Sequence, residues 1–199
     1  MRLLLMGPPG AGKGTQSATL SARYELPQVS TGDIFRAHVS GDTELGRTAR
    51  SYMDAGEYVP DEVTNEMVRH RLHQPDAADG FLLDGYPRTL DQVRTLDDIL
   101  GELHTALDAV VELTVDKEEL IARLLMRAQD SGRADDTEDV IRHRQDVYVD
   151  QTAPLVATYE QRGLLIRIDG MGDVDDVGRR IAEALRERGL DASPEGSGR

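Results

Sequence analysis

Cysteine is absent from this chain of 199 residues. Without thiols the protein cannot form disulfide bonds, and the usual structural zinc sites, which depend on cysteine ligands, are excluded. A chain without cysteine suits a reducing compartment. We therefore expect a cytoplasmic protein that holds no structural zinc.

Long hydrophobic runs are absent as well. No stretch approaches the roughly 20 consecutive apolar residues that a membrane-spanning helix needs. The apolar part of the N-terminal MRLLLMG is too short for the core of a signal peptide. We expect no membrane partner, which agrees with a location in the cytoplasm.

Positive charge is scarce. Lysine and arginine together number 23 against 37 acidic residues, which gives a formal net charge of -14 at pH 7. Such a surface repels the phosphates of nucleic acids, so a nucleic-acid partner is disfavoured. If the ligand is an anion, its positive partners must be gathered locally against the overall charge.

The hydrophobic content of 39% and the length suit one soluble domain of ordinary size. Short apolar runs recur along the chain, and they are continuous rather than alternating, as in a parallel sheet buried on both faces. They predict strands at 2–6, 28–29, 81–83, 109–113 and 164–168. Helical patterns between them cover 13–24, 89–100, 117–128, 137–161 and 174–188. This alternation predicts an α/β fold.

Two regions interrupt the alternation. Residues 34–71 contain short helical patterns and no good strand, so we expect a helical insertion after the second strand. Residues 129–136 are polar and contain glycine, which predicts a short loop. Pro154 should kink or split the helix over 137–161, because proline lacks a backbone N–H. The last helix should end at Gly189.

Residues 7–16 read GPPGAGKGTQ, and the first seven match G-x-x-x-x-G-K between a predicted strand and a predicted helix. Glycines let successive backbone N–H groups converge on a phosphate, and the helix N-terminus adds partial positive charge. Lys13 would supply a point charge to the outer phosphates. Serine or threonine usually follows the lysine and binds magnesium, but here Gly14 follows and Thr15 comes next.

Two arginines of the predicted helix 137–161 can be distinguished by geometry. Arg142 and Arg144 lie about 200° apart around a helix, so they face opposite sides. Arg142 has acidic residues four positions before and after it, as in a solvent-exposed ladder of ion pairs. Arg144 has Val140 and Tyr148 at those positions, on the apolar side, where a cation needs an anionic partner. Arg144 is therefore the functional candidate.

Residues 89–92 read TLDQ, which is a T-x-x-Q capping box at a helix start. In that structural role the side chain of Gln92 would fold back onto the Thr89 amide. In a functional role its amide would pair with an adenine edge, as glutamine pairs with adenine elsewhere. One side chain cannot easily do both, and these residues alone leave the choice open.

Four segments together carry a resemblance: GPPGAGKGTQ, STGDIFR at 30–36, GEYVP at 56–60 and DGYPRTLDQ at 84–92. They resemble the motifs of the adenylate kinases, within the nucleoside monophosphate kinase family. The resemblance runs from residue 1 to about residue 188. It implies an α/β, three-layer P-loop NTPase core with a five-stranded parallel sheet, a helical nucleoside-monophosphate-binding insertion and a short lid loop.

The implied organisation is a single P-loop kinase domain over 1–199. Within it, a monophosphate-binding lobe is expected at 30–59 and a lid at 126–136. The lid is short and has no cysteine, so the chain resembles the short-lid type without a zinc-binding insert. Residues 191–199 are small and polar, and we expect a disordered tail.

The resemblance also implies roles for individual residues. Those expected to bind ATP are Gly10, Ala11, Gly12, Lys13, Gly14, Thr15, Arg123, Arg127 and Gly172. Those expected to bind AMP are Thr31, Arg36, Glu57, Tyr58, Val59, Gly85, Tyr86, Pro87, Arg88, Gln92, Arg133 and Arg144. The expected catalytic cations are Lys13, Arg88, Arg123, Arg127, Arg133 and Arg144. The expected Mg²⁺ site, which holds the ion through water, consists of Asp33 and Asp84.

Most of these residues also have a structural interpretation. The two aspartates could be cap or turn residues, and the loop arginines could be solvent-exposed charges. Arg123 has Glu119 four positions earlier, which is the spacing of a helical ion pair. Gly172 could belong to an ordinary strand-to-helix turn. The five histidines follow no ligand spacing and are expected at the surface.

The activity that the resemblance implies is reversible transfer of the terminal phosphoryl group of MgATP to AMP, giving two ADP and maintaining adenine nucleotide balance. The attacking phosphate oxygen is already anionic, so positioning and charge neutralisation suffice without a general base. Related UMP/CMP kinases usually carry Asn and Ala in place of Gln92 and Thr31, which favours AMP. A UMP/CMP kinase and a non-catalytic ATP-binding regulatory protein are the alternatives. We expect ATP, AMP and ADP as partners, Mg²⁺ with ATP, and a monomer.

Overall fold

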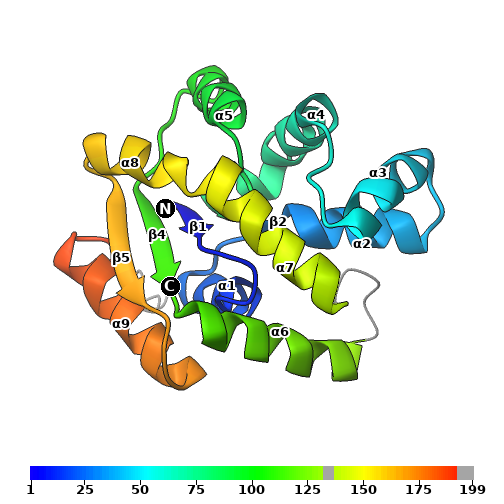
Figure 1. The fold of residues 1–199 in the computed structure, drawn as a ribbon. Coiled ribbons are helices and arrows are strands. Elements are labelled where there is room, and N and C mark those ends of the chain that lie inside the picture. The colour runs from blue at the N-terminus through cyan, green and yellow to red at the C-terminus, as the bar shows by residue number, and fades with distance from the viewer. Residues whose placement is uncertain (132–136, 192–199) are drawn as a thin grey trace.

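The protein is described here by a computed structural model, which covers residues 1–131 and 137–191. Its centre is a five-stranded sheet in which all strands are parallel, in the order β2-β3-β1-β4-β5 (Figure 1). The strands are β1 Arg2–Met6, β2 Gln28–Ser30, β3 Phe81–Asp84, β4 Ala109–Thr114 and β5 Leu165–Asp169. The predicted five-stranded parallel sheet is therefore confirmed.

The strands are continuously apolar because both faces of the sheet are covered. In β1, Leu4 and Met6 face one hydrophobic cluster, whereas Leu3 and Leu5 face the other. Alternate side chains of a strand point to opposite faces, so an apolar residue is needed at every position. Because all the strands are parallel, their carboxyl ends lie at a single edge of the sheet, beside the loop that follows β1.

Helices form the two outer layers. On one face α1 (Lys13–Tyr24) packs against α9 (Val174–Glu187), and their apolar residues share a cluster with the sheet. The other face is covered by α4 (Asp61–Leu72), α5 (Leu90–Glu102) and α8 (Pro154–Gln161). Figure 1 shows the sheet between these helices. The last helix ends as expected, with Gly189 at a φ of +74° just beyond it.

The insertion between β2 and β3 is helical, as the sequence predicted. It contains α2 (Thr31–Ser40), α3 (Glu44–Ala55), α4 and the short 3-10 helix Pro75–Ala77. Helices α2 and α3 pack on each other around a small cluster formed by Phe35, Ala49 and Val59. This cluster is separate from the two that flank the sheet, and Figure 1 shows α3 projecting to one side of the molecule.

One sequence expectation needs correction. Helix α6 (Lys117–Ser131) continues through residues that were predicted as loop, because no glycine or proline interrupts it before residue 132. The helix predicted at 137–161 is split near Pro154, as expected, into α7 (Glu138–Val147), a π-helical turn η3 (Tyr148–Thr152) and α8, although the π-helical turn itself was not predicted. Pro154 stands at the first turn of α8, where its missing N–H costs nothing. The helix widens before it, with Ala153 N donating to Tyr148 O at 2.9 Å.

Within the described residues, no helix is both long enough and apolar enough to cross a membrane.

Candidate active site

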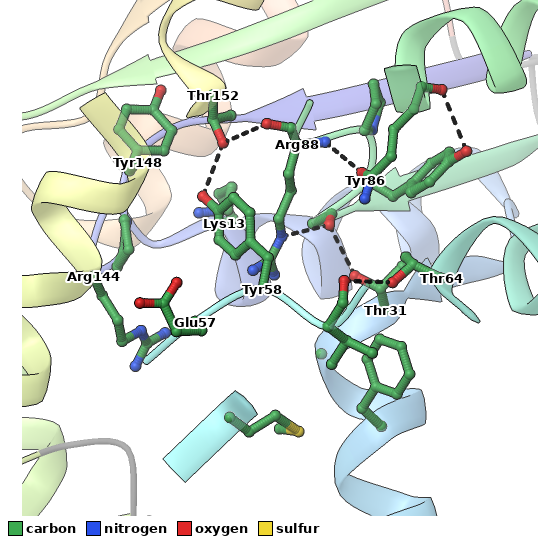
Figure 2. A pocket seen from close by; sticks show the side chains of 18 of the residues that line it. Lys13, Thr31, Glu57, Tyr58, Thr64, Tyr86, Arg88, Arg144, Tyr148 and Thr152 are labelled. Atoms are coloured by element: carbon green, nitrogen blue, oxygen red, sulfur yellow. Dashed lines mark hydrogen bonds between the residues drawn. The ribbon is translucent and has the colours of Figure 1, made fainter. Parts of the chain in front are cut away.

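A cavity of about 120 Å³ lies at the carboxyl end of the sheet. Its walls come from the loop after β1, the start of α2, residues 56–59, residues 85–88, and the α7 and η3 segment (Figure 2). Figure 2 shows Arg144 approaching from α7, across the cavity from Thr31 and Thr64. In open parallel sheets, ligands bind at this edge of the strands, so the position itself indicates a binding site.

The loop after β1 has the geometry that its glycines predicted. Gly10 and Gly12 have φ near +90°, a region that side chains other than glycine rarely adopt. A Cβ atom on Gly10 would lie 2.8 Å from the carbonyl oxygen of Leu120, so α6 also excludes a larger residue there. A Cβ on Gly14 would meet nothing within 4 Å. Lack of space therefore does not explain why Gly14 replaces the usual hydroxyl residue.

Lys13 is folded over this loop. Its Nζ donates to the carbonyl oxygens of Gly7 and Pro8, at 2.7 and 3.1 Å. The pKa of the Lys13 amine is lowered to about 8, chiefly by burial, and nearby arginines including Arg88 and Arg144 lower it further, while Asp84 opposes them. Several cations are thus brought close together, an arrangement that suits an anionic ligand.

Two carboxylates, Asp84 and Asp33, lie close enough to influence each other, and Asp84 is near Lys13. Asp84 ends β3 and is 7% exposed, and burial raises the pKa of its carboxyl while Lys13 and Arg88 lower it. Asp33 lies in the first turn of α2 and forms an ion pair with Arg36. The N-cap of α2 is Ser30 rather than Asp33, because the Ser30 hydroxyl accepts from Asp33 N at 3.3 Å.

This donor set fits Mg²⁺, which binds through one or two carboxylates and keeps several waters. It does not fit a metal that needs a complete set of protein ligands. Among the described residues, no group of three or more acidic or histidine side chains could hold an ion.

Gly85 and Thr31 form a tight corner of the cavity. The Thr31 hydroxyl donates to the carbonyl oxygen of Gly85 at 2.8 Å, and Arg88 Nε donates to the same oxygen at 2.7 Å. Gly85 has a φ of +80°, and a Cβ there would lie 2.9 Å from Thr31 Oγ1. Glycine is therefore required at this position both for its backbone conformation and for space.

Arg88 is held by an aromatic ring. Its guanidinium carbon lies 4.7 Å from the centre of the Tyr58 ring, within the range of a cation–π contact. The Tyr58 hydroxyl lies 2.8 Å from Thr152 Oγ1, and the Thr152 hydroxyl donates to the backbone oxygen of Arg88 at 2.9 Å. Figure 2 shows Arg88, Tyr58 and Thr152 grouped together. Two segments distant in the chain thus help to orient one arginine.

Gln92 does not take the structural role that its motif suggested. Thr89 caps α5, because its hydroxyl accepts from Gln92 N at 3.1 Å. The side-chain Oε1 of Gln92 accepts from the backbone N–H of Arg88, not of Thr89, at 2.7 Å. Its Nε2 donates to Asp61 Oδ1 at 2.7 Å. Gln92 still lines the cavity.

The remaining acceptor-side residues are placed as follows. Val59 and Tyr86 are buried, and the Tyr86 hydroxyl donates to Asn65 Oδ1 at 2.8 Å, so this ring also belongs to the protein core. Burial raises the pKa of the Tyr86 hydroxyl. The carboxylate of Glu57 lies 2.6 Å from Nε2 of His143 on α7. Pro87 lines the cavity beside them.

Helix α7 presents Arg144 to the cavity. The side chain of Arg144 passes close to the loop at 56, since a Cβ on Gly56 would lie 3.0 Å from Arg144 Cγ. Arg142 pairs with Glu138 at 2.8 Å on the exposed side, which matches the opposite orientations that the spacing predicted. Arg36 lines the same cavity with Lys13, Arg88 and Arg144.

The other ATP-side residues lie outside this cavity lining. Arg123 Nε donates to Glu119 Oε1 at 2.8 Å, and its Nη1 donates to the carbonyl oxygen of Gly170 at 3.2 Å, so the helical ion pair is present. Arg127, also on α6, is close enough to contribute to the lowered pKa of Lys13. Gly172 has a φ of +95° in the loop before α9. Arg133 lies outside the described residues.

Sequence reasoning missed several residues of the site. Gln145 is buried beside Arg144 and donates from Nε2 to the carbonyl oxygen of Pro9 at 2.8 Å. Thr152 donates to the backbone oxygen of Arg88. Asp61 accepts from the side chain of Gln92. The available signal was weak: Gln145 follows Ile141 by four positions and so shares its buried face.

Comparison with known proteins agrees with this geometry. The family model described as adenylate kinase matches residues 5–164. An adenylate kinase of Nocardioides sp. is 61% identical over 185 residues, covering 93% of this chain and 97% of that protein. The adenylate kinase of Kocuria rhizophila is 60% identical over 184 residues, with 92% and 98% covered. That of Thermobifida fusca is 57% identical over 188 residues, with 94% and 100% covered. The extent of these matches, together with the phosphate loop and the cations around it, shows that the chain belongs to the adenylate kinase family.

Proposed function

We propose that this protein catalyses the reversible transfer of the terminal phosphoryl group of MgATP to AMP, giving two ADP. The observation that carries the proposal is the gathering of Lys13, Arg36, Arg88 and Arg144 around one cavity, in a chain whose net charge is -14. Such a local concentration of cations suits a row of phosphates.

The donor nucleotide would lie on the phosphate loop. Backbone N–H groups of residues 10–15 and the N-terminus of α1 would bind its phosphates, with Lys13 moving from the Gly7 carbonyl to the outer oxygens. Arg123 and Arg127 from α6 would contact the same phosphates. Gly172, which has a positive φ and no side chain to cover its backbone, would lie beside the adenine of ATP.

The acceptor nucleotide would occupy the cavity. Arg36 and Arg88 would bind the phosphate of AMP, and Arg144 would lie between the two nucleotides. The adenine base of AMP would lie against Thr31, Val59 and the amide of Gln92. Other parts of the wall are formed by Glu57, Tyr58, Gly85, Tyr86 and Pro87. Gln92 and Thr31 support AMP over UMP or CMP as acceptor.

Asp33 and Asp84 are the residues that would hold Mg²⁺ through water. Bound Mg²⁺ neutralises phosphate charge and helps to orient the transferred group. Asp84 suits this role because it is a buried carboxylate at a strand end, close to Lys13.

The chain's own contribution is to position the phosphates and neutralise their charge. The attacking oxygen of AMP is already an anion, so no side chain has to remove a proton. Removing one well-placed donor from such a site typically lowers the rate about 10²-fold or more. Closure of the lobe at 30–59 and the lid at 126–136, which would bring in Arg133, would exclude water as a competing acceptor.

We further propose that the protein acts as a monomer in the cytoplasm, with ATP, AMP and ADP as its partners. The absence of cysteine and the acidic surface support this. Light scattering coupled to size-exclusion chromatography tests the monomer directly, and a mass near 21.9 kDa is expected.

The activity is tested by offering MgATP with AMP, UMP, CMP, GMP or no acceptor, and following ADP formation. Of the acceptors offered, only AMP is expected to give rapid ADP formation. Turnover with UMP in place of AMP would overturn the acceptor assignment. Equal ADP formation with and without acceptor would identify an ATPase and overturn the proposal as a whole.

A further inference from the structure

Both the oxygen and the nitrogen of the Gln92 side-chain amide are hydrogen-bonded. One partner can only donate and the other, when ionised, can only accept. The amide Oε1 accepts from the backbone N–H of Arg88 at 2.7 Å, and the amide Nε2 donates to Asp61 Oδ1 at 2.7 Å. A backbone N–H is only a donor, and an ionised carboxylate is only an acceptor. Rotating the amide by 180° would place two donors together at Arg88 and two acceptors together at Asp61, so only one orientation is allowed.

Asp61 is itself fixed. It is the first residue of α4, and its Oδ2 accepts from the Thr89 hydroxyl at 2.6 Å. Thr89 in turn accepts from the backbone N–H of Gln92, so its hydroxyl proton must point toward Asp61. The carboxylate therefore connects two segments 28 residues apart in the chain and satisfies both of its oxygens.

The fixed amide keeps unused hydrogen-bonding capacity. Nε2 carries a second proton and Oε1 a second lone pair, because each atom makes one hydrogen bond within the part of the chain that the structure describes. Gln92 is 1% exposed and lines the cavity, so a base in the cavity is the natural partner for these groups.

The two purine types present opposite patterns to such an amide. A 6-aminopurine offers an acceptor at N1 and a donor at its amino group. A 6-oxopurine in the same position offers a donor at N1 and an acceptor at O6. A freely rotating amide could pair with either, whereas an amide with a fixed orientation pairs with only one and leaves buried polar groups unpaired against the other.

We propose that Asp61 is a positioning residue for acceptor specificity: by fixing the orientation of the Gln92 amide, it makes the cavity discriminate AMP from 6-oxopurine monophosphates such as IMP and GMP. This inference rests on the proposed function, since it requires the acceptor base to lie against Gln92. Asp61 acts through Gln92 and need not touch the nucleotide.

The test compares kcat/KM for AMP and IMP in the full-length Asp61→Ala variant, with MgATP saturating. The AMP-to-IMP ratio is expected to fall about tenfold, because a rotated amide is then mispaired only at the Arg88 N–H and no longer also at Asp61. KM for ATP should stay unchanged. If IMP turns over too slowly, its inhibition constant against AMP replaces kcat/KM.

Two variants separate positioning from a general structural effect. Glu62→Ala removes an exposed acid from the same first turn of α4 and should leave the ratio unchanged. Asp61→Asn can still turn its amide oxygen toward Gln92 Nε2, so it should retain most of the discrimination. If Asp61→Ala fails to fold, Asp61→Ser, which suits a helix N-terminus, carries the same expectation.

A Gln92→Leu variant tests whether Gln92 contacts the acceptor base, separately from whether Asp61 acts through Gln92. If Gln92→Leu lowers the AMP-to-IMP ratio but a folded Asp61→Ala changes AMP and IMP equally, the positioning role of Asp61 is wrong while the acceptor site stands. If Gln92→Leu leaves the ratio unchanged, the amide does not contact the base, and both the inference and this part of the proposed site are wrong.

Discussion

Gln145 on α7 donates a hydrogen bond from its side-chain Nε2 to the carbonyl oxygen of Pro9, 2.8 Å away in the phosphate loop. The two residues are 136 positions apart in the chain. The adjacent Arg144 lines the acceptor cavity. One turn of α7 therefore contacts the proposed sites of both nucleotides, and it fixes the loop backbone relative to the arginine.

Gln145→Leu tests this anchor. The substitution leaves the Pro9 carbonyl without its partner, and the loss of one such bond at a buried site should raise KM for ATP about threefold to tenfold. Steady-state kinetics with each nucleotide varied in turn measure the change. Gln161→Leu, an exposed glutamine at the end of α8, is the matched control. An increase in KM for AMP with KM for ATP unchanged would contradict the role assigned to Gln145.

Lys13 should make stability depend on pH. Its pKa is lowered from 10.5 to about 8 in the folded protein, chiefly by burial. Between about pH 8 and 10.5 the unfolded chain then binds more protons than the folded one, so the free energy of unfolding rises with pH over that window. The charged lysine is thus unfavourable to folding below pH 8, and this effect is relieved as the pH rises.

Lys13→Met removes that contribution. The free energy of unfolding of the variant minus that of the unmodified protein should be larger at pH 7 than at pH 10. Urea unfolding at both pH values measures this difference. Lys117→Met, which removes an exposed lysine at the start of α6, controls for the loss of charge elsewhere. Profiles of Lys13→Met and the unmodified protein that run parallel from pH 7 to 10 would show that burial of Lys13 does not matter for stability.

Tyr58 contributes to the site by its ring and by its hydroxyl, and two substitutions separate the contributions. Tyr58→Phe keeps the ring 4.7 Å from the Arg88 guanidinium and loses only the hydrogen bond with Thr152. It should change KM for AMP by less than about threefold. Tyr58→Leu also removes the cation–π contact and should raise that KM up to about tenfold. Equal effects of the two substitutions would mean that the hydroxyl, not the ring, orients Arg88.

Asp33 and Arg36 form an ion pair in which the side chains are 61% and 32% exposed. If Arg36 binds the phosphate of AMP, that phosphate must compete with Asp33 for the guanidinium. Asp33→Asn should therefore tighten AMP binding without Mg²⁺, by at most about fivefold because an exposed pair is weak. Isothermal titration calorimetry in EDTA measures this affinity. Unchanged or weaker binding would show that the pair does not limit access to Arg36.

Local sequence patterns predicted the parts of this protein that depend on neighbouring residues. The continuous apolar run of β1 indicated a strand buried on both faces, and Gly10, Gly12 and Lys13 follow it within a few positions. The opposite orientations of Arg142 and Arg144 follow from helical geometry alone. The split of the long helix at Pro154 was predicted, but the π-helical turn before it was not, because nothing in the sequence distinguishes that turn from regular helix.

Gln92 shows where local patterns stop being sufficient. Its motif suggested a structural bond to the Thr89 amide, yet its Oε1 accepts from the Arg88 N–H and its Nε2 donates to Asp61, 31 positions earlier. Gln145 with Pro9, and Tyr58 with Thr152, are likewise pairs brought together only when separate elements pack.

The sequence by itself determined the phosphate loop, the parallel sheet and the residue types available to bind nucleotides, because these depend on periodicity and on backbone conformations within a few residues. Only the tertiary structure decided which donor meets which acceptor around the cavity. That choice depends on the packing of α4, α5 and α7 against the sheet. The spacing between two residues along a chain carries no information about the distance between their side chains after such packing.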